Sequence, residues 1–182
     1  MKIGLWVEGA TDIAFFPELT AKVLDIDSRE IVSRNRRGTC IRGVKHGLAA
    51  IIKEFQTLNC THIVVCADNH QSRASERARL VQGVMDIAAP MPCAVGVAIE
   101  CLEAWLLADF ATLCETLKVP PISQPPLVEQ ISDPKEYLRQ HLDVCPNLED
   151  LRIFASKMNI ERARRTSESF DRFICALESW RT

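Results

Sequence analysis

Three apolar segments of this chain end in a carboxylate, although the acids are far apart in the sequence. Glu8 follows IGLWV, Asp68 ends THIVVCAD and Glu100 ends PCAVGVAIE. Carboxylates held close together repel one another unless a cation neutralises their charge. Hard divalent cations such as Mg²⁺ and Mn²⁺ prefer oxygen ligands of this kind. The three acids therefore predict a metal site, provided that the fold brings them together.

Three further side chains accompany these acids. Asp12 follows the first acid by four residues, so the first turn of a helix would bring it back to the same place. His70 follows the second acid by two residues, and Glu103 follows the third by three, on the same helical face. The six candidate ligands predict one or two ions, and two ions together can activate a water and stabilise the leaving oxygen of a phosphodiester.

Each of these residues also has a structural interpretation. An acid at a strand end often caps the next helix, and Asp12 taken alone fits an N-cap. His70 alone fits a loop histidine, and Glu103 alone fits an ion pair with an arginine. The metal site is favoured because three strand-end acids coincide.

The elements that must position these acids alternate between strand and helix. We expect strands at 3–7, 29–35, 61–68 and 92–100, with helices between them and a further helix over 101–117. This alternation predicts an α/β, Rossmann-like fold with a mostly parallel four-stranded sheet flanked by helices. Ligands of such sheets bind outside the carboxyl ends of the strands, so the acids are expected at one edge.

The character of the chain changes after residue 118. KVPPISQPP is proline-rich and cannot be regular structure, and helical segments follow it. Asp133 and Pro134 have the types expected of an N-cap and a first helical residue, and Ser167 could cap the last helix. We expect an α/β domain at 1–118, with a proline-rich connection and a helical appendage packed on it at 119–182.

Positive side chains at two places could contact a phosphate. A basic loop follows the second strand, and RARR precedes the last helix; arginine binds phosphate bidentately. A glycine after the first acid would let a phosphate or metal approach the backbone. The alternatives are a solvated loop and a salt-bridged surface. The candidate phosphate-binding residues are Gly9, Arg36, Arg37, Lys45, Arg164 and Arg165.

Composition limits the possible partners. The formal net charge is -2, so nucleic-acid binding would need a local basic patch or a metal. No apolar run approaches the roughly 20 residues that span a bilayer. MKIGLWVEG does not have the pattern of a signal peptide, so we expect a cytoplasmic protein with no membrane contact. The 8 cysteines are scattered without a Cys-x-x-Cys motif, which favours reduced core residues.

Several of these segments resemble known motifs. VEGATDIAFF resembles the first motif of TOPRIM domains, and VVCADNH lies where such domains carry Asp-x-Asp. AIECLEAWLLAD and RARRTSESFDRFICAL are similar to blocks of a TOPRIM-like family of short bacterial proteins, DUF4276. The Glu-x-x-x-Asp spacing at residues 8–12 also resembles the TOPRIM half of OLD-family nucleases (overcoming lysogenization defect). The resemblance spans nearly the whole chain.

The resemblance implies a TOPRIM-like fold and a metal-dependent nuclease. Glu8 and Asp68 match the core catalytic pair, and Asp12 with Glu100 or Glu103 matches the accessory acids. It also implies a nucleic-acid substrate, with DNA favoured over RNA, and a role in phage defence. OLD-type proteins often work beside an ABC or AAA ATPase. This chain has no Gly-x-x-x-x-Gly-Lys-Ser/Thr loop, so such an ATPase would be a separate protein.

One position departs from the family pattern. His70 stands where the second aspartate of Asp-x-Asp is expected, and histidine suits Mn²⁺ better than Mg²⁺. This departure implies a changed metal preference, one metal in place of two, or lost catalysis. Two alternatives therefore stay open: a catalytically weak binding or regulatory subunit of an ATPase complex, and a nucleotide phosphohydrolase using the same site.

Overall fold

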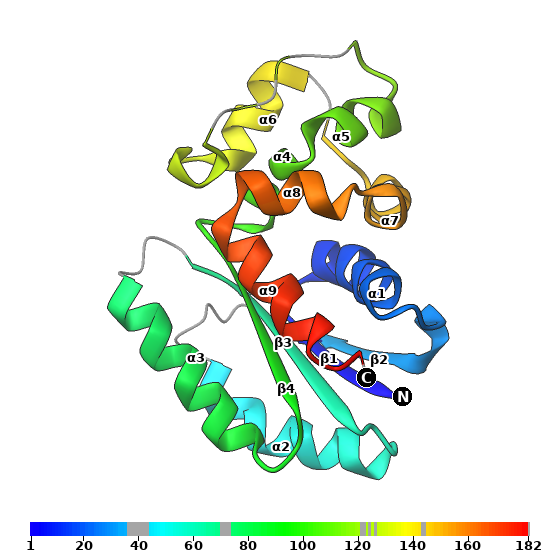
Figure 1. Cartoon of the computed structure of the whole chain (residues 1–182), viewed down its shortest axis with the longest axis vertical. Coiled ribbons are helices and arrows are strands. Elements are labelled where there is room, and N and C mark those ends of the chain that lie inside the picture. Colours follow the sequence, from blue (N-terminus) through cyan, green and yellow to red (C-terminus); the bar gives the residue numbers. More distant parts are fainter. Residues whose placement is uncertain are drawn as a thin grey trace.

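A four-stranded parallel sheet lies at the centre of the molecule (Figure 1). The computed structural model describes residues 1–35, 44–69, 74–120, 123, 125, 127–142 and 145–181, with side chains omitted for 44–46. The strand order is β2-β1-β3-β4, and each neighbouring pair is parallel. The strands are β1 (Ile3–Val7), β2 (Ile31–Asn35), β3 (His62–Asp68) and β4 (Cys93–Ala98). The predicted α/β fold with a parallel four-stranded sheet is confirmed.

Two strands are shorter than the sequence predicts by two residues or more. Residues 28–30 form a 3₁₀ turn (η1, Ser28–Glu30), so β2 begins only at Ile31. β4 ends at Ala98, two residues before Glu100, which lies in a turn at φ 64°. The expectation that Glu100 ends the fourth strand is therefore wrong, because the chain leaves the extended conformation before it.

Helices cover both faces of the sheet. Side chains alternate between the faces of a strand, so Leu5 and Val64 face one cluster while Trp6 and Val65 face the other. Helices α1 and α9 pack on the first face, and α2 and α3 pack on the second (Figure 1). Their bounds are α1 (Ala10–Leu24), α2 (Val44–Thr57), α3 (Ala74–Ala88) and α9 (Glu168–Glu178).

The connections reverse direction at the centre of the sheet. α1 leads from β1 outward to β2 on one face, and α3 leads from β3 outward to β4 on the opposite face. The helices that follow β1 and β3 therefore diverge from the carboxyl ends of these adjacent strands. Such a switch point is where ligands of open parallel sheets bind.

The remaining helices lie beyond the carboxyl ends of the strands (Figure 1). They are α4 (Leu102–Ala108), α5 (Phe110–Leu117), η3 (Val128–Gln130), α6 (Pro134–Leu142), α7 (Leu148–Lys157) and α8 (Ile160–Thr166). The single helix expected at 101–117 is wrong, since Asp109 breaks it at φ −123° and ψ 61°. The fully buried Asp109 carboxylate accepts bonds of 2.6 Å from Arg162 Nη1 and from the Asn159 backbone N–H. These partners stabilise the break.

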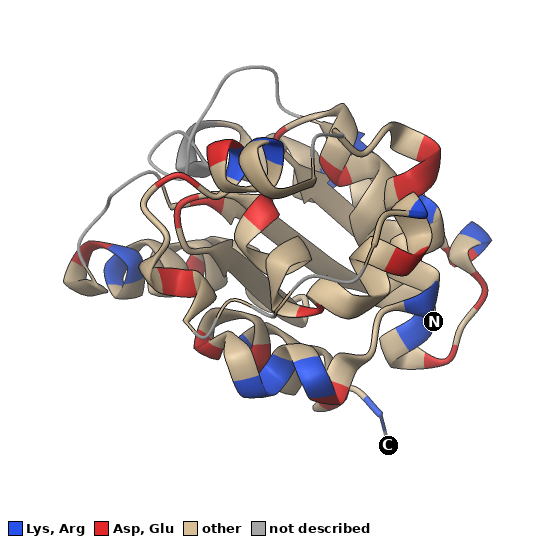
Figure 2. Ribbon diagram, turned by 90° about the horizontal axis from the view of Figure 1, so that it is seen from above, with Lys and Arg blue, Asp and Glu red and all other residues tan. Residues whose placement is uncertain are grey.

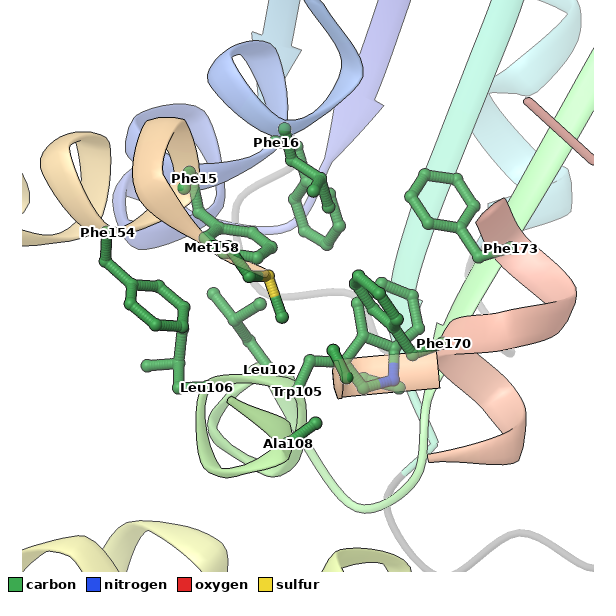
Figure 3. Packing of buried hydrophobic residues seen from close by; sticks show 14 of the residues in the cluster. Phe15, Phe16, Leu102, Trp105, Leu106, Ala108, Phe154, Met158, Phe170 and Phe173 are labelled. Carbon is green, nitrogen blue, oxygen red and sulfur yellow. The ribbon is translucent and has the colours of Figure 1, made fainter. Parts of the chain in front are cut away.

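Trp105 lies in the larger of the two hydrophobic clusters. It is fully buried, and its ring contacts Phe16, Phe170 and Phe173 (Figure 3). Its indole Nε1 donates to Ser169 Oγ at 2.8 Å. This cluster joins side chains of α1 and α4 to side chains of α7 and α9, so it crosses the boundary expected at residue 118. The division into 1–118 and 119–182 stays a prediction.

Smaller expectations can be checked in the described ranges. Asp133 Oδ1 accepts from the Glu136 N–H and Ser167 Oγ from the Phe170 N–H, so both residues cap helices as predicted. The cysteines of the described chain are all free, and four of them are buried. None of the helices described is both long and apolar enough to cross a membrane.

Candidate functional site

Glu8 and Asp68 meet at the switch point between β1 and β3. Trp6 is the register partner of Val65, so Glu8 lies beside the end of β3. Glu8 Oε1 accepts a long hydrogen bond of 3.4 Å from the Asp68 backbone N–H. The fold thus brings together the two acids that the sequence singles out as the core pair.

Asp12 belongs both to the first turn of α1 and to this acidic cluster. Its Oδ2 atom accepts from the backbone N–H groups of Glu8 and Gly9, each at 3.0 Å. The residue is buried, with 9% of its surface exposed. Gly9 is the N-cap of α1 and Asp12 is the third helical residue, so the N-cap interpretation is wrong, although the Asp12 side chain does bond back to the N-cap N–H. The same carboxylate also acts electrostatically on Asp68.

Glu103 reaches the site from the first turn of α4. Its charge acts on both Asp68 and Asp12, and its Oε1 atom lies 3.8 Å from Lys135 Nζ. Glu100 is partly exposed in the turn between β4 and α4. The segment after β4 therefore contributes Glu103 to the electrostatics of the cluster, and a role for Glu100 stays a prediction.

The cluster carries an excess of negative charge. Burial, and then the charges of Asp12, Glu8 and Glu103, raise the pKa of Asp68 to about 8. Burial also raises the pKa of Asp12, although its two N–H bonds act in the opposite direction. A divalent cation would neutralise this charge, and the carboxylate oxygens are the donors that Mg²⁺ or Mn²⁺ would take.

The positions of the side chains show whether a metal site is already formed. Within the described ranges, no group of three His, Cys, Asp or Glu side chains is arranged closely enough to hold a metal. The acids are nevertheless near enough for their charges to raise the pKa of Asp68. The residues present fit a hard cation in charge and donor type.

Lys135 is a member of the site that sequence reasoning misses. It lies at the start of α6, and the carboxylate of Glu103, more than any other group, raises its pKa, with smaller effects from Asp68 and Asp12. A cavity of about 360 Å³ lies beside it, lined by Glu103, Lys135 and Arg139 among others. A single lysine in DPKEYL carries no sequence signal, and only packing places it opposite acids from three other segments.

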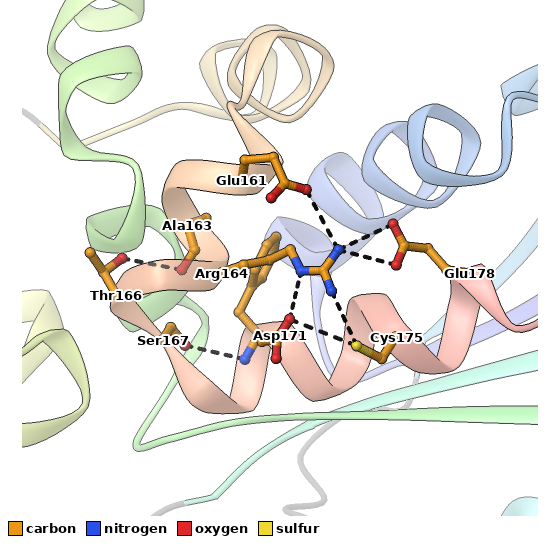
Figure 4. Close-up of polar contacts among 9 residues, drawn as sticks. Glu161, Ala163, Arg164, Thr166, Ser167, Asp171, Cys175 and Glu178 are labelled. Carbon is orange, nitrogen blue, oxygen red and sulfur yellow. Dashed lines mark hydrogen bonds and ion pairs between the residues drawn. The ribbon is translucent and has the colours of Figure 1, made fainter.

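The candidate phosphate-binding residues are placed less favourably. The Gly9 N–H already donates to Asp12. Arg164 lies among Glu161, Asp171 and Glu178, at 3.6, 2.6 and 3.1 Å (Figure 4). A phosphate would have to compete with these three carboxylates, so Arg164 fits the salt-bridged interpretation.

Arg165 is better exposed than its neighbour. It lines a cavity of about 530 Å³ beyond the end of β4. Seen from above, short acidic and basic segments are scattered over a ribbon that is mostly uncharged (Figure 2), which agrees with the near-neutral net charge. The remaining candidates lie outside the described residues and side chains: His70, Arg36, Arg37 and Lys45.

Comparisons with known proteins identify the family. The C-terminal region of the Burkholderia pseudomallei OLD protein is similar over 99% of this chain and 98% of that chain, with 13% identity and a TM-score of 0.41. That likeness is too distant to carry a functional inference. None of the curated proteins matches the chain. The model of the family described as "Domain of unknown function (DUF4276)" matches residues 7–178, so the chain belongs to this family.

Proposed function

We propose that the protein is a divalent-metal-dependent phosphodiesterase that acts on nucleic acid, with DNA favoured over RNA. One observation carries the proposal: carboxylates from β1, α1, β3 and α4 converge at the switch point and raise the pKa of Asp68 to about 8. Conformational stability alone gives no reason to gather like charges in this way. Clusters of this kind occur where a site must hold a cation.

Each residue then has a defined role. Glu8 and Asp68 are proposed as the central metal ligands, and Glu8 is also proposed to accept a proton from an attacking water. Asp12 has one oxygen not used by its two capping bonds, and this oxygen and Glu103 complete the ligand set. His70 and Glu100 are proposed as accessory ligands. One or two Mg²⁺ or Mn²⁺ ions would supply charge neutralisation and water activation when bound.

Lys135 is proposed to stabilise the phosphate. Its Nζ atom lies 3.8 Å from Glu103 Oε1 and its side chain is 63% exposed, so a phosphate oxygen could approach it. A positive charge aimed at a phosphoryl group stabilises the negative charge that develops in the transition state. Such a lysine also explains how an acidic cluster could accept an anionic substrate.

The test is a cleavage assay on plasmid DNA and on RNA with Mn²⁺ or Mg²⁺, paired with calorimetric titration of each metal. We expect Glu8→Gln and Asp68→Asn to abolish both cleavage and metal binding. Asp86→Asn, an exposed carboxylate on α3, is the matched control and should leave both unchanged. Cleavage that survives both site substitutions would refute the assignment.

A second candidate is a binding or regulatory subunit with little catalysis of its own, working with a separate ATPase in phage defence. It is favoured by His70, which stands in the second position of the resembled Asp-x-Asp motif. Metal binding without cleavage by the isolated chain, together with cleavage on addition of a co-purifying ATPase, would support it. Hydrolysis of free nucleotides in preference to polynucleotides would instead support a nucleotide phosphohydrolase.

A further inference from the structure

The sheet ends in an open edge at β4. In the described part of the chain, β4 pairs with β3 on one side and is the last strand of the sheet. A groove of about 390 Å³ runs along its other side, between α3 and α9. Figure 1 shows β4 with one of these helices on each side. Val95 and Val97 line the groove floor, and Val81 and Met85 line its α3 side.

The alternation of hydrogen bonds along β4 shows which of its backbone groups face this edge. Ile63 N–H donates to Pro92 O at 2.9 Å, and Asn69 N–H donates to Ala98 O at 3.0 Å. Even-numbered residues of β4 therefore face β3. Because backbone groups alternate along a strand, the N–H and C=O groups of Cys93, Val95 and Val97 point to the open edge.

This edge is self-complementary. If β4 pairs antiparallel with β4 of a second copy about an axis at Val95, Cys93 lies opposite Val97 of that copy. Each of these residues then forms the hydrogen-bonded type of antiparallel pair, exchanging both backbone bonds with its partner. The side chains brought together are small or β-branched, which is the composition that suits cross-strand contact.

Helix α3 offers matching contacts under the same two-fold axis. Met85 is 44% exposed, although it lines the groove with Ala78. The axis sets α3 antiparallel to its copy, so Met85 meets the small side chain of Ala78 in the second copy. Arg79 lies in the first half of α3 and Asp86 in the last half, and both are exposed. Antiparallel packing therefore places opposite charges together.

Two positive side chains also line the groove, Arg77 on α3 and Arg172 on α9. Glu168 already forms an ion pair with Arg172, so the like charges are partly compensated.

We propose that the protein forms a two-fold dimer through the β4 edge, with the two sheets joined as one. An antiparallel junction points the carboxyl ends of the two sheets in opposite directions. The two acidic sites then face away from each other, and each is complete within its own chain.

Sedimentation equilibrium of the full chain tests the proposal. We expect a dimer, and Met85→Glu should raise the dissociation constant at least about tenfold because it buries an unpaired carboxylate against Ala78 of the second copy. Ile87→Glu is the matched control, since Ile87 is 37% exposed on the same helix but lies two residues, and so about 200° around the helix, from Met85. Circular dichroism and urea denaturation of each variant separate lost association from lost folding.

A charge swap supplies an independent test. Arg79→Glu and Asp86→Arg should each weaken the dimer, and the double variant should recover most of the loss. The two residues are separated by about 10 Å along one helix, so recovery requires contact between copies. A chain that remains monomeric at about 100 µM, an equal effect of Met85→Glu and Ile87→Glu, or failure of the double variant to recover would overturn the proposal.

Discussion

Replacing Asp68 by asparagine should flatten the loss of stability that the metal-free protein undergoes as the pH rises. The pKa of Asp68 is about 8 in the folded chain, against an ordinary value of 3.8. Between these two values the folded state keeps a proton that the unfolded state has released. Raising the pH therefore favours unfolding, by at most about 1.4 kcal/mol per pH unit.

The magnitude follows from the same two values. Between pH 6 and pH 8, one such proton lowers the free energy of unfolding by about 2 kcal/mol, since the folded-state group is half titrated at the upper end. The charges of Asp12, Glu8 and Glu103 contribute to the raised pKa of Asp68, so the loss depends on the whole cluster. The difference between the wild-type chain and Asp68→Asn isolates the contribution of Asp68.

Urea denaturation in EDTA at pH 6, 7 and 8 provides the measurement. We expect the loss in Asp68→Asn to be less than half of that in the wild-type chain, and the loss in Asp86→Asn to equal it. Saturating Mn²⁺ should stabilise the wild-type chain more at pH 8 than at pH 6, because metals bind the deprotonated carboxylates. A wild-type stability that stays flat or rises over this range, or an unchanged slope in Asp68→Asn, would refute the reasoning.

Three further predictions concern single positions. Lys135→Gln should lower kcat for nucleic-acid cleavage by about 100-fold while leaving urea stability unchanged. Lys53→Gln, at an exposed lysine of α2, is the matched control and should leave both quantities unchanged; equal losses of kcat would show a general surface effect. Gly4→Ala should lower the free energy of unfolding by about 1–3 kcal/mol or more, because the new Cβ would lie 2.3 Å from the Phe55 ring; an unchanged urea midpoint would contradict this. Asp109→Ala should cost about 1–3 kcal/mol, because it leaves the Asn159 N–H without its acceptor while the 40% exposed Arg162 can turn to water, and a loss below about 1 kcal/mol would mean that the carboxylate is not needed at the helix break.

Local patterns were sufficient to predict the strands that carry the core pair of acids. IGLWV is an apolar run bounded by an acid and a glycine, and it is found as β1 at the predicted residues. The β3 prediction differs from the structure by one residue. Both strands are buried on two faces, and a strand in that environment has a continuous apolar run in its sequence.

Other features depended on contacts between distant segments. The helix break at Asp109 is stabilised by groups from residues 159 and 162, and no local propensity predicts it. α9 was expected in an appendage, yet Phe173 and Ile174 belong to the cluster that covers the sheet. An amphipathic pattern shows that a helix has an apolar face but not which surface that face meets.

The sequence by itself determined the parallel sheet and the delivery of Glu8 and Asp68 to one edge, because the alternation of strand and helix favours parallel strands and the strand ends are marked by local residues. Only the tertiary structure decided that Glu103 contributes its charge to the cluster from the segment after β4, and that Lys135 faces the acids. The reason is physical: the charge on a buried carboxylate depends on the groups within a few ångströms of it, and the fold selects those groups from segments that are distant along the chain.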